Sequence, residues 1–596
     1  MAKLLVNHFN SQASKAQTFF SGAMGVDMGR FWVVLLWAAA GLGEAAGSWA
    51  RFYGDNVQFS DLKLTLDGKA IVLGSLDDED SCGSWVAKLD SGEIVWQKCY
   101  GGRFYAVLPT RDGGFLLVGQ IEDPDEGQLL KLDAQGQVQW QKSYYVSLPE
   151  AKVKLRAALE METGYIAVGS IEWDGPSKAW ILGLDQNGNL LWQKTLTGFM
   201  ATTIQSARDG NFLIAGAAEV AGQGEAWLLK LTPDGQSVWQ KTYGGSEELP
   251  GGWEDVLSAL DVQETLAGEY LLAGVTFDAL PDLGGGFLPE FRARAWIAKL
   301  DQSGRLKWRR VYGEQLPFAQ MTQVLPTPDG GFLAVGAGGD PKQGQGLAVW
   351  LAKLTAQGEI EWQKLYGKAG FNDALFLKQL ADGKLLLAGA SFLNTRGDWL
   401  LKLEADGSLP ECGLEGLVTV FPGDASLRER AIARAESPPV VIVRQQEARA
   451  EDRSVVALPA CPVAEAFGSC SQIQAAGKSY GDGSYPVALR TPTGPELLGA
   501  RCAMKAFGGG WMLIARRLLN DPRPPSDFVN LRFGEYDGFS ESFSIWPVVD
   551  WRATSGVVGL SWIEDFELKA SLLGDLSAEK LQAILATSPQ VAAWVR

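Results

Sequence analysis

A single pattern recurs along most of the chain, and it constrains the fold more than any other feature of the sequence. In one copy, the turn Asp112-Gly113 precedes the apolar run Phe115–Val118, and a later apolar run leads through Asp133 and Gly136 to Trp140-Gln141-Lys142. The first of these turns recurs at Asp67-Gly68, Asp112-Gly113, Thr163-Gly164, Asp209-Gly210, Ala267-Gly268, Asp329-Gly330 and Asp382-Gly383. Repeated units of this length bury a continuous core only by stacking on their neighbours.

Each copy contains four short runs with the composition of strands, separated by turns whose glycine supplies a positive φ. The third run recurs around Trp85, Gln128, Trp180, Trp227, Trp296, Trp350 and Trp399, and the fourth around Trp96, Trp140, Trp192, Trp239, Trp308 and Trp362. Seven four-stranded units predict a mainly β fold, a seven-bladed β-propeller over residues 46–410. The loops between second and third strands should crowd one face, with the fourth-strand tryptophans wedged between blades.

The seventh copy lacks its fourth strand, and the start of the chain supplies a replacement. After Asp406-Gly407 the chain runs into Cys412 where a Trp-Gln-Lys strand is expected, whereas Trp49–Gly54 resembles Trp239–Gly244. We therefore expect residues 48–54 to form the outer strand of the last blade. This strand would join the two ends of the repeat array, so that no sheet edge stays open between them.

The first 45 residues read as a secretory signal peptide with an upstream extension. The apolar run Phe31–Ala40 follows Arg30, is too short to span a bilayer, and precedes small residues that suit cleavage after Ala40 or Ala45. We expect a secreted protein, extracellular or at the cell surface, without membrane insertion after cleavage. Six cysteines fit an oxidising compartment. Fifteen pairings are possible, of which proximity favours Cys82–Cys99, Cys412–Cys461 and Cys470–Cys502.

Charge and composition narrow the chemistry. The formal net charge is −17, which disfavours nucleic acid as the main partner. The one histidine lies in the leader, so histidine-based catalysis is not expected and the chain is predicted not to be an enzyme. No cofactor is expected except possible calcium at the acidic loop residues Asp77, Asp78 and Asp80. A glycine-rich insertion carries Phe287 and Phe291, which are candidate ligand contacts.

The units resemble secreted bacterial propeller repeats with the pattern WxxKLDxxGxxxWQKxYGG, over about residues 48–410. That resemblance implies a scaffold and no particular reaction. Residues 411–468 are predicted to be a small connector clamped by Cys412–Cys461. From Cys470 the chain carries Gly481-Asp482-Gly483, Cys502-Ala-Met504 and Gly508-Gly509-Gly510-Trp511. Residues 469–596 are therefore predicted to be an α+β domain that resembles a fibrinogen C-terminal-like domain over roughly residues 468–550. The resemblance implies binding of acetylated sugars or proteins and matches Cys470–Cys502 to that family's first disulfide.

These observations together predict a secreted binding or adhesion protein that recognises a glycan or protein at a cell surface or matrix. Tyr536, Trp546 and Trp551 are candidates for a stacking platform, although core packing also accounts for such aromatics. Two alternatives stay open. One is a structural component of an extracellular fibre or envelope, for which oligomer or fibre association is expected, and the other is a carboxylate-dependent glycan hydrolase. The identity of the ligand is not encoded in any motif.

Overall fold

The computed structural model describes most of the repeat region and parts of the remainder. Described are residues 47–410 except 55–56, 77–82, 123–124, 149, 221–222, 246–255, 280–290, 314–317, 341–344, 367–372 and 391–397. Further along the chain they are 415–416, 422–424, 427–431, 441–446, 450–451, 457–461, 469–479, 483–491, 494–503, 511–517, 543–544, 558–564, 567–574 and 591–595. In all of these described residues together, no helix is long and apolar enough to cross a membrane.

The repeat region folds into four-stranded antiparallel sheets, and within most of them the strands follow chain order. The first sheets contain β2 (Val57–Leu64), β3 (Ala70–Leu76), β4 (Ser84–Asp90) and β5 (Glu93–Tyr100); β6 (Arg103–Pro109), β7 (Phe115–Glu122), β8 (Asp125–Leu132) and β9 (Val138–Val146); β10 (Lys152–Glu160), β11 (Gly164–Trp173), β12 (Gly175–Asp185) and β13 (Leu190–Thr197); and β14 (Phe199–Ser206), β15 (Phe212–Val220), β16 (Gln223–Leu231) and β17 (Ser237–Gly245). Next come β18 (Val256–Glu264), β19 (Tyr270–Ala279), β20 (Phe291–Leu300) and β21 (Leu306–Tyr312); β22 (Phe318–Pro326), β23 (Phe332–Asp340), β24 (Gln345–Leu354) and β25 (Ile360–Tyr366); and β26 (Asp373–Gln379), β27 (Leu385–Ala390) and β28 (Asp398–Leu403), completed by β1 (Trp49–Tyr53).

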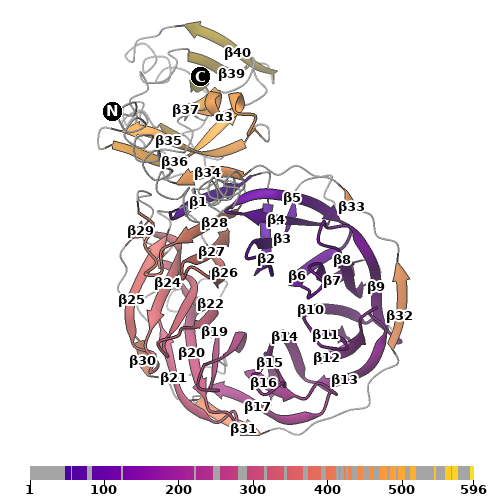
Figure 1. Ribbon diagram of the computed structural model, residues 1–596. Helices are drawn as coiled ribbons and strands as arrows, with labels where there is room; N and C mark the ends of the chain where they lie inside the picture. Colours follow the sequence, from indigo (N-terminus) through magenta and orange to yellow (C-terminus); the bar gives the residue numbers. More distant parts are fainter. Residues whose placement is uncertain are drawn as a thin grey trace, which may run out of the picture. The chain divides into compact units, whose positions relative to one another are not determined.

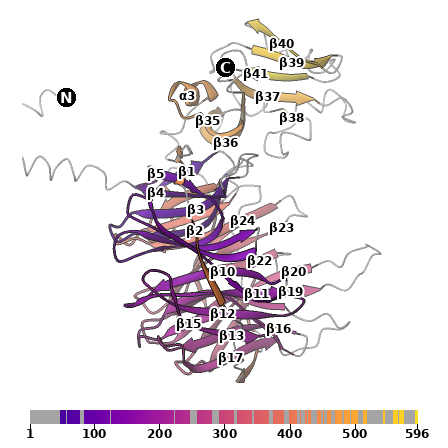
Figure 2. The same cartoon turned by 90° about the vertical axis from the view of Figure 1, so that its right-hand side faces the viewer.

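The sheets are arranged as in a β-propeller, with the first strand of each sheet innermost (Figure 1). Each innermost strand contacts the innermost strand of the next sheet, in the order β2, β6, β10, β14, β18, β22 and β26, and β26 contacts β2. The ring of contacts is therefore closed. Figure 2 shows the same sheets from the side, with their strands running across the thickness of the ring.

The predicted closing strand is confirmed. β1 pairs antiparallel with β28, placing Phe52 opposite Trp399 and Tyr53 opposite Asp398. Phe52 and Tyr53 are fully buried. The Asp398 carboxylate also accepts a hydrogen bond from the backbone N–H of Phe59 in β2, so the last sheet is tied to the first by two segments far apart in sequence.

Tryptophan and tyrosine side chains fill the seams between neighbouring sheets, as the sequence predicts for the tryptophans. The indole of Trp96 lies against Gly136 in the next sheet's turn, where φ is +74° and an added Cβ would lie 2.9 Å from the ring. Six seams also contain a buried tyrosine whose hydroxyl donates to the carbonyl of the same turn glycine: Tyr53 to Gly92, Tyr100 to Gly136, Tyr144 to Gly188, Tyr243 to Gly304, Tyr312 to Gly358 and Tyr366 to Gly407.

The seam between β10–β13 and β14–β17 is built differently. The position of the tyrosine is occupied by the buried Leu196, although Trp192 still packs on the turn glycine Gly235. In the other sheets a lysine on the third strand forms an ion pair with a carboxylate near the preceding turn, such as Lys131 with Asp112 at 2.7 Å. In this sheet the equivalent position holds Gly183, so the ion pair cannot form. This sheet thus lacks two contacts that recur in its sister sheets.

Within residues 411–468, the stretch predicted to be a small disulfide-clamped connector, the described segments lie along the outer edges of the sheets. Six short strands, which we call the belt, each add to the outer edge of one sheet (Figure 1). They are β29 (Glu415–Gly416) on β25, β30 (Pro422–Asp424) on β21, β31 (Leu427–Ala431) on β17, β32 (Val441–Gln446) on β9, β33 (Ala450–Glu451) on β5 and β34 (Ala457–Cys461) on β1. Among the described residues β13 has no fifth strand. Outer edges otherwise open to other chains are thereby covered.

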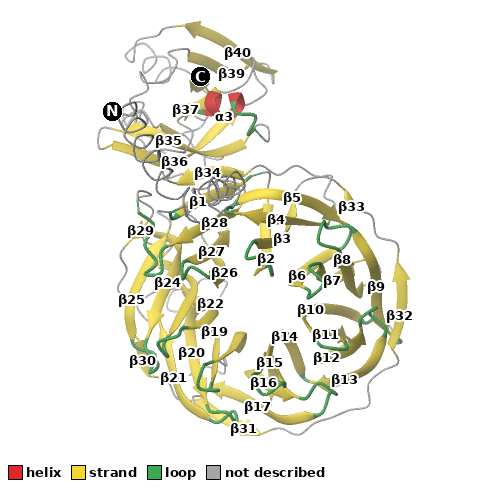
Figure 3. Cartoon of the chain, viewed as in Figure 1, coloured by secondary structure: helices red, strands yellow, loops and turns green. Residues whose placement is uncertain are grey.

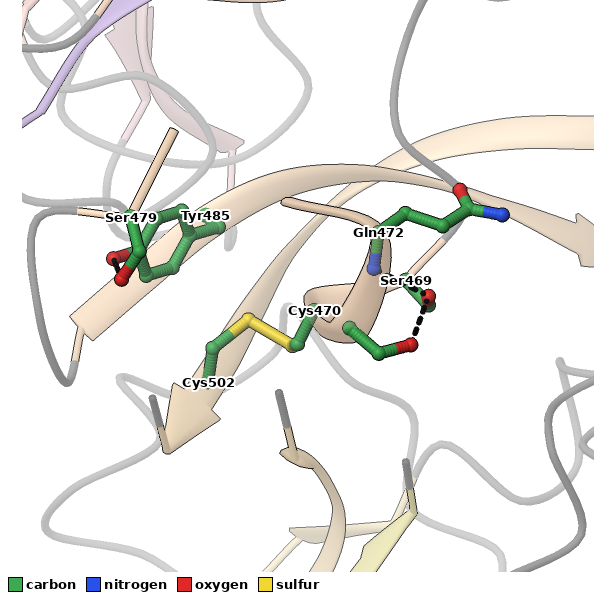
Figure 4. Close-up of a disulfide and its surroundings, with 7 residues drawn as sticks. Ser469, Cys470, Gln472, Ser479, Tyr485 and Cys502 are labelled. Carbon is green, nitrogen blue, oxygen red and sulfur yellow. Dashed lines mark hydrogen bonds between the residues drawn. A yellow bond between two sulfur atoms is a disulfide. The ribbon is translucent and has the colours of Figure 1, made fainter. Parts of the chain in front are cut away.

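The last part of the chain is also mainly β, with one described helix (Figure 3). Its sheet has the order β35 (Gly483–Thr491), β36 (Gly494–Ala503), β37 (Trp511–Arg517), β41 (Val591–Val595), β39 (Val558–Glu564) and β40 (Glu567–Gly574), with β38 (Phe543–Ser544) on β37. The helix α3 (Cys470–Ala475) is capped by Ser469, whose hydroxyl accepts from the backbone N–H of Gln472 at 3.3 Å. Cys470 is bonded to Cys502, as expected (Figure 4).

Candidate functional site

The innermost strands enclose a cavity at the centre of the ring. Its volume is about 430 Å³, and every innermost strand contributes to its wall. The lining consists of Lys63, Ala106, Val107, Leu108, Ala157, Ala158, Leu159, Thr203, Ile204, Gln205, Asp261, Gln263, Thr322, Gln323, Leu325, Phe376 and Lys378. We call this space the central channel. A concave site with a few polar groups in an apolar wall is typical of ligand binding.

A repeated backbone irregularity shapes the wall. Each innermost strand has a β-bulge near its middle, for example between Phe59 and Asp61 in β2 and between Ala259 and Asp261 in β18. The same shift occurs in β6, β10, β14, β22 and β26. A bulge bends its strand and turns the following side chain in a new direction. The residue after the bulge therefore occupies an equivalent place in all of these sheets.

Two of these equivalent positions hold buried aspartates that bridge neighbouring sheets. Asp61 Oδ2 accepts from the backbone N–H of Val107 in β6 at 2.9 Å, and Asp261 Oδ2 accepts from that of Val324 in β22 at 3.1 Å. Gln323 acts in the same way, since its Oε1 accepts from the N–H of Leu377 at 2.8 Å. These three side chains fix one innermost strand to the next, whereas the other equivalent positions hold alanine, threonine or phenylalanine.

Each aspartate uses its second oxygen within its own strand. Asp61 Oδ1 accepts from Lys63 Nζ at 2.7 Å and from the N–H of Leu62 at 2.8 Å. Asp261 Oδ1 accepts from Gln263 Nε2 at 3.1 Å and from the N–H of Val262 at 2.9 Å. Burial raises the pKa of Asp261 to about 6, a rise that these accepted hydrogen bonds and the charge of Lys378 reduce.

Two lysines from adjacent innermost strands face the channel. Lys63 in β2 is paired with Asp61, and 38% of its side chain is exposed. Lys378 in β26 has no hydrogen-bond or ion-pair partner among the described residues, although Asp61 and Asp261 act on it at longer range. Enclosure in the channel and then the charge of Lys63 lower the pKa of Lys378 to about 8. Channel solvent still reaches this side chain, because it is only partly buried.

Two guanidinium groups contact one aromatic ring on the strands that line the channel. The bulge residues Tyr105 and Arg156 belong to adjacent innermost strands, and the Arg156 guanidinium lies 4.4 Å from the centre of the Tyr105 ring. The guanidinium of Arg103 lies 5.7 Å from the same ring. Such contacts are favourable electrostatically and hold the arginine side chains next to the lining residues Ala106 and Ala157.

The sites predicted from sequence lie almost entirely outside the described residues. This holds for the ligand candidates Phe287, Tyr536, Trp546 and Trp551, for the calcium candidates Asp77, Asp78 and Asp80, and for Cys82 and Cys412. Phe291 is the first residue of β20 and pairs with Ala279. Cys99 is disulfide-bonded, and the described part of the chain holds no free cysteine. No group of three or more metal-binding side chains occurs among the residues described.

The channel residues were not singled out from the sequence. One sequence feature could have identified them, namely a polar residue at a strand position that is apolar in other repeats. Asp61, for example, occupies the position that Ala106 and Ala157 occupy in their own repeats. An alignment of the repeats through their innermost strands would have exposed this difference. The bulge that makes these positions equivalent is a property of backbone pairing, so the spacing alone does not reveal it.

Comparisons with known proteins add partial structural likeness. No protein-family model and no curated protein matches the chain. Among solved structures, the dihydro-heme d1 dehydrogenase NirN is 14% identical, with 64% of this chain and 74% of that chain covered and a TM-score of 0.36. A protein from Lactobacillus plantarum is 11% identical over 53% and 96% of the two chains, with a TM-score of 0.34. A mannose phosphorylase from Leishmania mexicana is 10% identical over 62% and 91%, with a TM-score of 0.24.

Proposed function

We propose that the chain is a secreted seven-bladed β-propeller protein that binds a glycan or protein at a cell surface or matrix, without catalysing a reaction. The observation that carries the proposal is the make-up of the central channel. Its described wall combines apolar surface with amide, hydroxyl and ammonium groups, which suit recognition. Its carboxylate, Asp261, already accepts hydrogen bonds on both oxygens from neighbouring groups.

The fold supports a role as a rigid platform. A closed ring with covered outer edges holds the loops at its faces in fixed positions, which is how many binding proteins present their contacts. The C-terminal resemblance supports the same function, since it implies a helix at the first cysteine and a Cys470–Cys502 bond, and the structure contains a helix that begins at Cys470 and that bond. In this proposal the C-terminal module contributes a second binding surface.

The hydrolase alternative makes a different demand on the site. Glycoside hydrolysis needs two carboxyl groups that face one substrate across a gap of about 5–10 Å. Among the described residues, Asp61 and Asp261 are the buried carboxylates of the innermost strands, and both are engaged in bridging neighbouring sheets. Their geometry favours a structural role over acid–base catalysis, because a catalytic carboxyl must reach its substrate.

The fibre alternative predicts a broad apolar surface. In the described residues, the large exposed hydrophobic side chains are single residues distributed over several sheets: Leu66, Val95, Leu191, Met200, Val238 and Leu266. Scattered residues of this kind are normal for a soluble surface, whereas an assembly interface needs a contiguous patch. The described surface therefore favours the binding proposal.

A glycan array and a pull-down from cell-surface extract test the proposal, both with the secreted full chain. We expect saturable binding to a restricted set of glycans or to one surface protein, with the bound glycan recovered intact. Release of reducing ends from a bound glycan would establish the hydrolase instead. Self-association into large assemblies by light scattering, with no ligand bound, would establish the structural component.

A further inference from the structure

The hydrogen-bonding groups in the central channel are unevenly matched. The carboxylate oxygens of Asp61 and Asp261 accept from backbone N–H groups, from Lys63 and from Gln263, and the Gln323 carbonyl accepts from Leu377. These acceptors are therefore largely occupied. Lys378 differs from the donors Lys63 and Gln263, because no acceptor among the described residues receives a hydrogen bond from its ammonium group.

The position of Lys378 makes this group notable. Its strand β26 is adjacent to β2, so Lys63 and Lys378 stand on neighbouring walls of the same channel. The charge of Lys63 opposes that of Lys378, and enclosure further disfavours the charged form. Asp61 and Asp261 attract Lys378 only at longer range. An anionic group held beside the two ammonium groups would relieve their repulsion and fill the empty donor positions of Lys378.

We propose that the central channel binds a carboxylate or similar oxyanion group of the ligand, with Lys378 as its main contact and Lys63 as a second positive charge. Charge-assisted hydrogen bonds from ammonium to carboxylate are shorter and stronger than neutral ones. Beside them, Leu108, Leu159 and Phe376 present apolar surface to the non-polar faces of a small ring. The ligand class that fits this combination is an acidic sugar. The inference rests on the proposed binding function and specifies its ligand.

The test compares binding of D-glucuronate, D-glucose and inorganic phosphate to the full chain by titration calorimetry near pH 7. We expect saturable binding of glucuronate and none of glucose, since the two differ in the carboxylate. Phosphate separates the sources of the anion: binding of phosphate as well as glucuronate shows a general oxyanion site, and binding of glucuronate alone shows a sugar-acid site. Both results support the proposal. Absence of saturable glucuronate binding overturns it.

Substitution of the central lysine identifies the contact. Lys378→Met should weaken glucuronate binding about tenfold or more, because a charge-assisted hydrogen bond is lost. Lys378→Arg should restore part of the affinity. Lys152→Met is the matched control, since Lys152 lies on the innermost strand β10 but is exposed and paired with Asp125. Equal affinity of Lys378→Met and wild type overturns the proposal.

Two further readouts separate loss of the site from loss of the fold. Lys378 has no described partner, so Lys378→Met should melt at or above the wild-type temperature. In wild type, glucuronate affinity should fall as pH rises through about 8, since Lys378 then loses its charge. A wild-type protein that binds an array glycan but not glucuronate disproves the anion site and leaves the binding function standing. A wild-type protein that binds glucuronate but neither an array glycan nor a surface protein retains the anion site and disproves the proposed surface ligand.

Discussion

Removing the strand that closes the ring should open the propeller. β1 contributes three buried aromatic side chains, Trp49, Phe52 and Tyr53, of which the last two are fully buried. Truncating one such side chain costs about 3–5 kcal/mol, so deletion of residues 46–54 removes about 9–15 kcal/mol of packing. That loss is as large as the whole stability of a typical domain, about 5–15 kcal/mol. The deleted protein should therefore not keep a closed ring.

Milder variants give a graded version of the same test. Phe52→Ala should cost about 3–5 kcal/mol. Tyr53→Phe should cost about 1–3 kcal/mol, because the Gly92 carbonyl, 2.7 Å from the hydroxyl, loses its buried donor. Tyr105→Phe is the control, since that ring is used for guanidinium contacts.

Hydrogen exchange and urea unfolding provide the measurements. Amides of β28 should lose protection in the deletion variant, since β28 is paired with β1 along its length. The urea midpoint should be highest for Tyr105→Phe, lower for Tyr53→Phe and lowest for Phe52→Ala. Unchanged β28 protection after deletion would show that β1 does not close the ring and would refute this reasoning.

Three further results are expected. Gly92→Ala and Gly113→Ala both place a side chain at positive φ, which costs about 1 kcal/mol of stability. Only at Gly92 does the new Cβ meet an indole, so Gly92→Ala should lower the free energy of unfolding in urea by about 1–3 kcal/mol more than Gly113→Ala does. Equal losses of stability in the two variants would contradict the seam packing. Leu196→Tyr should raise the free energy of unfolding by about 0.5–1.5 kcal/mol, and with it the urea midpoint, through a new hydrogen bond to the Gly235 carbonyl as in the sister seams, and a lower midpoint would disprove it. The folded-state pKa of Asp261 exceeds the unfolded value, so its contribution to stability is greatest below about pH 4 and declines as the pH rises to about 6. Across that range the free energy of unfolding of Asp261→Asn should gain about 3 kcal/mol relative to that of wild type. Parallel pH profiles of the two proteins would contradict this assignment.

Local pattern accounts for the parts of the fold that were predicted. Glycine turns and alternating strands are set by neighbouring residues, so the same local pattern recurs in each four-stranded unit and the units could be recognised from that repetition. The closing strand was also predictable, because Trp49–Gly54 copies the sequence of a fourth strand and the last unit lacked one. In the C-terminal part, the Cys470–Cys502 bond followed from the order of the cysteines and the resemblance.

The belt was not predictable in the same way. Its strands are between two and six residues long, carry no repeat, and add to sheet edges that lie from about 50 residues earlier, for β29 on β25, to about 400 residues earlier, for β34 on β1. Pairing at an open edge uses backbone N–H and C=O groups, which every sequence has, so the side chains give little sign of it. The sequence suggested a connector, and only backbone pairing in the tertiary structure shows that its described strands add to the outer edges of the sheets.

The repeating unit, the position of its turns and the segment that completes the last sheet could be predicted from the residues, because these features depend on contacts within one unit or between copies of one pattern. The central channel could not, because it forms only in the assembled ring. Lys63, Asp261 and Lys378 come from different units and meet only when all the innermost strands surround one axis. Their shared environment, and with it the lowered pKa of Lys378 and the raised pKa of Asp261, arises from enclosure that no single repeat provides.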